Sequence, residues 1–264
     1  PGPPGELVPM FNESVRGFLK KYSDGAIVSH TVNIIGMGES SVAEEIEDMF
    51  DAKNPTVAPY AKSGEVRLRI TAKAETADEA DKMCAPVVDE ICSRLGDVVY
   101  GTDMNSIEER VVALLKEKGK KIATAESCTA GYIPKRLTDI PGASEVFECG
   151  IVSYSNDMKI KLLGISTKTL DTYGAVSEQT AREMALGAKH VSGADIAIST
   201  TGLAGPGGDG VLPGGLSFAA VTDGERTVVE KIVTGHENDR EYNRYVTASR
   251  ALNLVRLMLE EKIK

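Results

Sequence analysis

The segment 124–132, TAESCTAGY, holds the residue whose type and position are best suited to chemistry, Ser127. The run 121–125 ahead of it predicts a strand, and residues 128–137 predict a helix. A hydroxyl at this junction lies at the mouth of an α/β sheet, where the following helix presents free backbone N–H groups. Ser127 is therefore a candidate nucleophile, and capping of the helix is the simpler alternative.

His30, His190 and His236 give poor support for a histidine triad, so the base that activates this hydroxyl is expected to be another residue. Lys159 follows the strand end Tyr154-Ser155-Asn156, and a desolvated lysine beside a tyrosine hydroxyl can activate a serine. Lowering a lysine pKa from about 10.4 to near 7 takes roughly 4 kcal/mol, which burial and a neighbouring cation can supply. Arg240 or Arg244 could be that cation. A solvated helix residue is the alternative for Lys159.

Two further features could hold an anion. The glycine-dense segment 202–210 follows a predicted strand, matches neither dinucleotide nor P-loop fingerprints, and offers backbone amides for a phosphate or an oxyanion. Arg240 and Arg244 lie four residues apart at the start of the last predicted helix, a spacing suited to gripping a phosphate from one face. A flexible surface turn and an exposed helix face are the respective alternatives.

Cys128 is a rival nucleophile, since a helix N-terminus lowers a thiol pKa. It ranks behind Ser127 because it lies one residue further into the predicted helix and is expected to face the core. The other cysteines are Cys84, Cys92 and Cys149, and none of the four forms a C-x-x-C pair. This spacing favours reduced cytoplasmic thiols over disulfides, and no metal site is expected.

Composition describes an ordinary globular protein of 264 residues, with 42% hydrophobic and 26% charged residues and a net charge of −9. No run approaches the roughly 18 apolar residues of a membrane span, and no signal peptide is visible. An acidic surface repels a phosphate backbone, so nucleic acid is not an expected partner. A small anionic substrate can still bind locally at arginines and helix N-termini.

The elements that must position these residues divide the chain into three parts. Residues 1–8 are expected to be extended and 9–22 helical, as the tail of a preceding domain. Residues 27–101 predict a small α+β domain, with strands at 28–36 and 64–74 and helices at 41–51 and 77–95. Residues 105–264 predict a five-stranded mixed sheet with helices on both faces, an α/β/α arrangement. Its strands are expected at 121–125, 148–154, 195–201, 215–222 and 226–233, the last two joined by an Asp-Gly hairpin.

Five ordered motifs in 105–264 resemble the C-terminal domain of the CinA family. They are TAESCTAGY, FECGIVSYSNDMKIKLLGI, GAVSE, STTGLAGPGG and DREYNR. Residues 27–101 resemble the KH-like middle domain of that family, notably in IIGMGES and NPTVAPYAKSGEVRLRITA. Residues 1–22 resemble the end of its molybdopterin-binding-like first domain. Most of that domain, with any pyrophosphatase activity the family places there, is expected to lie outside this chain.

The resemblance implies a cofactor-independent, cytoplasmic amidohydrolase that converts nicotinamide mononucleotide to nicotinate mononucleotide and ammonia. It assigns the catalytic roles to Ser127, Tyr154 and Lys159. It also implies that Thr201, beside Gly202 and Gly205, contacts the nicotinamide or the oxyanion. It further implies that Arg240 binds the nucleotide phosphate, with Arg244 one helical turn further on.

Two other functions remain open from the sequence. The segment Leu212–Ser217 departs from the family pattern, which favours a non-catalytic module that binds or senses a pyridine nucleotide. A KH-like domain suggests RNA binding, although Gly36-Met37-Gly38-Glu39 is not a regular G-x-x-G clamp. Exposed edges of a small α/β domain would allow self-association into a homo-oligomer.

Overall fold

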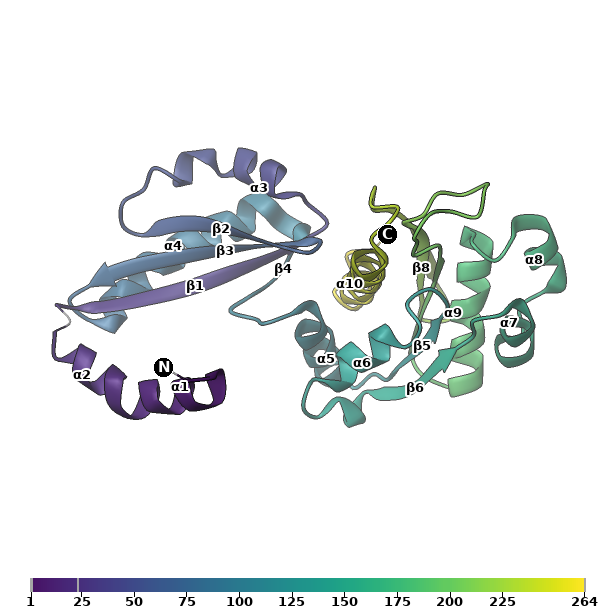
Figure 1. The fold of residues 1–264 in the computed structure, drawn as a ribbon, viewed down its shortest axis with the longest axis horizontal. Coiled ribbons are helices and arrows are strands. Elements are labelled where there is room, and N and C mark those ends of the chain that lie inside the picture. Colours follow the sequence, from purple (N-terminus) through teal and green to yellow (C-terminus); the bar gives the residue numbers. More distant parts are fainter. Residues whose placement is uncertain (1, 23, 264) are drawn as a thin grey trace.

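A computed structural model describes residues 2–22 and 24–263, which form a leading helical segment and two domains (Figure 1). The leading segment comprises α1 (Pro4–Met10), a π-helical turn (Phe11–Val15) and α2 (Arg16–Lys20), and none of its residues is buried. The expectation of an extended 1–8 is therefore wrong from Pro4 onward, because Pro4 stands in the first helical turn, where its missing N–H costs nothing.

The small domain is a four-stranded antiparallel sheet in the order β2-β3-β1-β4, covered by α4. Alternate residues of β3 are buried, as in a sheet with one covered face. Thr76 caps α4 through a reciprocal capping box with Glu79. The elements are β1 (Ala26–Ile35), α3 (Glu39–Glu45), β2 (Thr56–Lys62), β3 (Glu65–Ala74), α4 (Ala77–Leu95) and β4 (Val99–Thr102).

The large domain has a five-stranded mixed sheet in the order β6-β5-β7-β8-β9, in which β6, β5 and β7 run parallel. The strands β8 and β9 are antiparallel additions. The strands are β5 (Ile122–Glu126), β6 (Phe147–Val152), β7 (Ile196–Gly202), β8 (Leu216–Thr222) and β9 (Thr227–Val233). The helices are α5 (Ile107–Glu117), α6 (Tyr132–Thr138), α7 (Asn156–Leu163), α8 (Thr167–Tyr173), α9 (Glu178–Ser192) and α10 (Arg240–Leu259).

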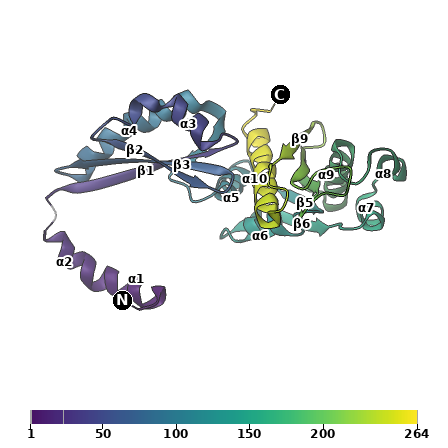
Figure 2. The ribbon, with the colours of Figure 1, turned by 45° about the horizontal axis from the view of Figure 1, so that its top comes forward.

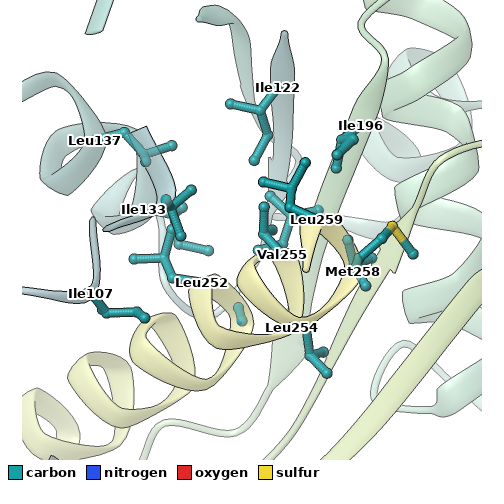
Figure 3. Close-up of a cluster of buried hydrophobic side chains, with 14 of the residues drawn as sticks. Ile107, Ile122, Ile133, Leu137, Ile196, Leu252, Leu254, Val255, Met258 and Leu259 are labelled. Carbon is teal, nitrogen blue, oxygen red and sulfur yellow. The ribbon is translucent and has the colours of Figure 1, made fainter. Parts of the chain in front are cut away.

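Helices cover both faces of this sheet. On one face α10, α5 and α6 pack over the strands, with Leu252, Val255 and Leu259 of α10 against Ile122 and Ile133 (Figure 3). On the other face α9 packs along the strands with α7 and α8 beside it. A strand buried from both sides needs no polar alternation, which is why all of β5 is buried. The helix α10 lies where the two domains meet (Figures 1 and 2).

The predicted fold class, a mixed five-stranded α/β/α sheet after a small α+β domain, is confirmed. The elements β2, β4 and α8 were missed from the sequence, whereas the helix that Ser106 caps, α5, was expected from its capping residue and its apolar stripe. Of these, β2 is a short edge strand that contains Pro59, and β4 has four residues, so neither gives a long period. Within residues 2–22 and 24–263 no helix is long and apolar enough to cross a membrane.

The small domain contains a pH-sensitive contact between three of its elements. His30 of β1 lies between two carboxylates, with Nδ1 2.6 Å from Asp103 and Nε2 2.8 Å from Asp81 of α4. The hydrogen bond with Asp103 is the main cause that raises the pKa of His30 above its ordinary 6.5. The imidazolium form is therefore favoured by folding.

We expect the His30 contribution to stability to be complete below pH 6.5 and to be lost as the pH rises through the raised pKa. Urea unfolding between pH 6 and pH 9 should show this loss as a shrinking difference in unfolding free energy between the wild type and His30→Gln. The exposed His190 provides the control, His190→Gln, which should keep the wild-type pH dependence. An identical pH dependence in His30→Gln would contradict the assignment.

Candidate active site

Ser127 follows the last residue of β5 and is fixed by the sheet itself. Its N–H donates to Thr200 O of β7 over 2.9 Å, which continues the parallel pairing by one residue. After it the chain turns through Ala130 and Gly131, both in the left-handed region at φ 49° and 86°. The helix α6 therefore begins at Tyr132 and not at 128 as predicted, because two successive left-handed residues cannot continue a helix.

Lys159 lies opposite Ser127, in the second turn of α7. Ser155 caps this helix by accepting from the N–H of Met158, and the capped start directs Lys159 inward until it is 1% exposed. The Lys159 Nζ is 3.0 Å from Ser127 Oγ, 2.9 Å from Ser153 O and 3.1 Å from Tyr154 O. The structure thus brings these two predicted site residues together.

The three contacts of Lys159 fit a neutral amine. Burial lowers its pKa from the ordinary 10.5. A neutral amine has two hydrogens and one lone pair; the hydrogens can go to the two backbone carbonyls, and the lone pair then faces the Ser127 hydroxyl. Burial also raises the pKa of Cys128 to about 12, so its thiol carries no charge near neutral pH. A neutral amine in line with a hydroxyl is the arrangement of a general base and its nucleophile.

Tyr154 and Arg240 lie together at the opening of the site. The Tyr154 side chain is 60% exposed, and its hydroxyl accepts from Arg240 over 3.4 Å, whereas its contact with Lys159 is through the backbone carbonyl. Arg240 also donates to Gly205 O over 2.7 Å. The pair therefore joins the end of β6 to the glycine segment at the entrance.

These residues surround a cavity of about 320 Å³ at the carboxyl ends of β5, β6 and β7. Ligands of open α/β sheets bind at this edge. The cavity wall includes every predicted site residue except Arg244, namely Ser127, Tyr154, Lys159, Thr201, Gly202, Gly205 and Arg240. Asn156 and Val176 line it as well and were not predicted. In the described part of the chain no group of three or more His, Cys, Asp or Glu residues is placed to hold a metal ion.

Thr201 and Gly202 shape the cavity wall. The Thr201 hydroxyl donates to Ala175 O over 2.6 Å and so holds the segment before α9 against β7. A Cβ on Gly202 would lie 2.5 Å from Ser217 Cβ and 2.7 Å from Leu216 O, so β8 can approach only a glycine there. In this structure both positions fix the wall, and the Thr201 hydroxyl is already engaged.

Arg244 lies behind the nucleophile turn instead of in the cavity. It donates to Thr129 O over 2.7 Å, and its guanidinium lies 5.6 Å from the centre of the Tyr132 ring. The structure therefore separates the two predicted phosphate-binding arginines: Arg240 faces the cavity, and Arg244 holds the backbone that carries Ser127.

Asn243 is a residue of the site that the sequence analysis did not single out. It is 2% exposed on α10, and its amide donates to Ala204 O over 2.9 Å and to His236 O over 2.6 Å. Its own carbonyl accepts from Thr234. These bonds tie the glycine segment to α10. The sequence offered one signal for Asn243: its amide side chain stands between the two arginines of DREYNR, on the helix face directed at the site.

Glu126, next to Ser127, is also fully buried. One of its carboxyl oxygens accepts from the N–H of Ile133 over 3.2 Å, and the other has no hydrogen-bond partner among the described residues. Burial raises the pKa of this carboxyl.

The fold and this site define a class: a three-layer α/β protein with a half-buried serine next to a buried lysine at the carboxyl edge of its sheet. Comparison with family models identifies the family. The CinA C-terminal domain matches residues 104–259, and the KH domain of the damage-inducible protein CinA matches 29–101. The chain belongs to the CinA family.

Individual relatives agree with the family models. A competence-damage inducible protein of Clostridium beijerinckii is 53% identical over 241 residues, which cover 90% of this chain and 59% of the relative. A CinA-like protein of Desulfovibrio desulfuricans is 44% identical over 258 residues, 97% of this chain and 61% of the relative. The chain thus spans about 60% of the length of these relatives.

Solved structures include a competence/damage inducible protein, CihA, from Agrobacterium tumefaciens. It is 38% identical with a TM-score of 0.56, and the match covers 58% of this chain and 93% of that one. A competence or damage-inducible protein from Enterobacter asburiae is 28% identical with a TM-score of 0.55, covering 59% and 99%.

The role of Asn243 can be separated from its effect on stability. Asn243→Ala should lower the free energy of unfolding by about 1–3 kcal/mol, because buried carbonyls lose their donors. It should also speed amide exchange in segment 202–208, measured by mass spectrometry. Asn253→Ala removes a buried amide from the same helix that contacts Arg256, and should lower stability without affecting this segment. Unchanged exchange at 202–208 in Asn243→Ala would refute the role.

Proposed function

We propose that this protein is an amidohydrolase that converts nicotinamide mononucleotide to nicotinate mononucleotide and ammonia. The observation that carries the proposal is the contact of Lys159 Nζ with Ser127 Oγ at 3.0 Å, while two backbone carbonyls lie within hydrogen-bond distance of the same Nζ. The substrate class rests on the family resemblance and on an arginine at the entrance of a cavity large enough for a nicotinamide ring.

In the proposed reaction, Ser127 Oγ attacks the carboxamide carbon while Lys159 takes the hydroxyl proton. The protonated lysine then gives this proton to the leaving nitrogen, and ammonia departs. A water molecule, deprotonated by the same lysine, attacks the acyl-enzyme, and the carboxylate product leaves as the Ser127 hydroxyl is restored.

The developing oxyanion needs donors in the cavity wall. The N–H groups of Ser127, Leu203 and Gly207 are already bonded to protein carbonyls. We therefore assign the role to other amides of the wall, those of Cys128, Ala204 and Gly205 among them. At the entrance Arg240, braced by Gly205 O and Tyr154, is placed to meet the nucleotide phosphate, and the exposed Tyr154 ring is placed to cover the bound ligand.

The positions of two segments bear on the two rival functions. The atypical segment Leu212–Ser217, which favoured a non-catalytic sensor, does not line the cavity; it supports the glycine segment from behind through the bonds of Leu203 with Gly215 and Leu216. Gly36–Glu39, where a KH domain would clamp RNA, faces a cavity of about 490 Å³ shared with β9 and α10. The position of Leu212–Ser217 outside the cavity wall supports an enzyme over a sensor.

Adjacent substitutions test the nucleophile. Ser127→Ala should reduce ammonia release from nicotinamide mononucleotide by at least 10³-fold, because the covalent step is lost. Cys128→Ala should keep most of the activity, since burial holds that thiol neutral. The measurement is coupled detection of ammonia together with chromatographic detection of nicotinate mononucleotide. Absence of release by the wild type, or equal release by Ser127→Ala, would refute the proposal; binding without turnover would favour the sensor.

Lys159→Met should abolish turnover and at the same time stabilise the fold. A lysine whose pKa is lowered in the native state binds fewer protons than in the unfolded state, so the Lys159 contribution to stability should rise with pH up to about 10.4, opposite in sign to that of His30. Methionine removes this cost and the slope with it. Urea unfolding at pH 7 and pH 10 checks both points, with Lys161→Met on the exposed side of α7 as the control. A less stable Lys159→Met variant with the wild-type slope would contradict the neutral-amine assignment.

A further inference from the structure

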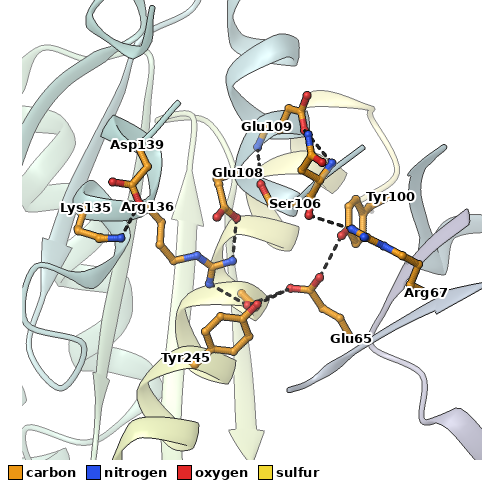
Figure 4. Close-up of polar contacts among 12 residues, drawn as sticks. Glu65, Arg67, Tyr100, Ser106, Glu108, Glu109, Lys135, Arg136, Asp139 and Tyr245 are labelled. Carbon is orange, nitrogen blue, oxygen red and sulfur yellow. Dashed lines mark hydrogen bonds and ion pairs between the residues drawn. The ribbon is translucent and has the colours of Figure 1, made fainter. Parts of the chain in front are cut away.

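A buried polar network joins the small domain to the helices that hold the active site (Figure 4). Its centre is Glu65, the first residue of β3, which is 5% exposed. Its carboxylate accepts from Tyr100 of its own domain over 3.0 Å. It also accepts from two hydroxyls of α10, Tyr245 over 3.3 Å and Ser249 over 3.4 Å.

The network continues from α10 to α6. Arg136 of α6 is 4% exposed and donates to Ser249 Oγ and to Glu108, each over 2.8 Å. Because the Ser249 hydroxyl accepts from Arg136, its single proton is free to point at Glu65. The guanidinium of Arg136 also lies 4.7 Å from the centre of the Tyr245 ring. One carboxylate of the small domain thus fixes residues on two helices of the large domain.

The same two helices carry the nucleophile turn. Tyr132, the first residue of α6, packs its ring edge-on against Tyr245, with 6.4 Å between ring centres. Arg244 adjoins Tyr245 on α10 and donates to Thr129 O, two residues after Ser127. A shift of Tyr245 therefore moves groups in direct contact with the turn.

Docking of the domains does not depend on Glu65 alone. At the opposite end of α10, Arg256 is fully buried and donates to Asp97 O over 2.6 Å and to Val99 O over 3.3 Å, both at the end of the small domain. The contact made by Glu65 lies at the half of α10 nearer the site. Its location suits a role in positioning this half of α10 relative to the active site, in addition to a role in docking the two domains.

We propose that Glu65 is a positioning residue for the active site of the other domain. By holding Tyr245 and Ser249 on α10, and through Ser249 Arg136 on α6, it sets the position of the turn that carries Ser127. The small domain then contributes to amide hydrolysis without touching the substrate. This inference rests on the proposed function for its kinetic consequence, but its structural consequence can be measured independently.

The test compares substitutions of Glu65 and of its bonding partners in the large domain and in the small domain. Glu65→Ala and Tyr245→Phe should lower kcat for ammonia release about tenfold with KM changed less than threefold, because a small displacement of a nucleophile slows chemistry more than binding. Glu65→Gln, which keeps the shape and one acceptor, should recover part of the rate. Tyr100→Phe removes a hydroxyl from the same carboxylate on the small-domain side and should leave kcat within twofold of the wild type.

Amide exchange of segment 127–133, followed by mass spectrometry, gives a readout that needs no activity. It should speed up in Glu65→Ala and Tyr245→Phe and stay unchanged in Tyr100→Phe. If Glu65→Ala does not fold, Tyr245→Phe carries both measurements. An inactive wild type would refute the amidohydrolase alone, since exchange would still report positioning. Wild-type kcat and exchange in Tyr245→Phe would overturn the inference.

Discussion

A lysine amine removed from water beside a serine hydroxyl is the constraint on which the site depends. Lys159 is buried by the packing of α7 behind the strand ends, and its pKa falls because an ammonium ion is poorly solvated there. The two carbonyls of Ser153 and Tyr154 orient the amine, and the pairing of β5 with β7 places Ser127 opposite. In the proposed mechanism, the lowered pKa of Lys159 takes the place of a histidine base.

The helix α10 organises what surrounds that pair. Its first two turns supply Arg240 at the entrance, Asn243 behind the glycine segment and Arg244 behind the nucleophile turn. Its middle receives the carboxylate of Glu65 from the small domain. This helix has polar groups on the faces toward the site and the small domain and apolar groups toward the sheet, so it is buried along most of its length. A single element thereby connects the core, the domain junction and the site.

The sequence predicted those features for which a local pattern of residues also determines the position in the fold. The five strands of the large domain follow from apolar runs and turn residues. Ser127 and Lys159 follow from strand ends that must converge, and Arg240 from its place at the start of the last predicted helix. The separation of Arg244 from Arg240 could not be predicted, because residues four apart on a helix share a face yet can contact different partners. Asn243 and Glu65 were missed for a similar reason: each acts on residues distant in sequence, Ala204 and Tyr245, and nothing local marks it. The start of α6 was misplaced because a left-handed alanine, Ala130, is rare.

The ionisation of Lys159 in the folded protein is the most direct test of this account. With lysine labelled at Cε, an NMR titration follows its ionisation in the wild type, and the Lys159→Met spectrum assigns the resonance. The account predicts a titration below the ordinary lysine pKa of 10.5. A titration at or above 10.5 would contradict it, because a permanently charged ammonium cannot accept the proton of Ser127.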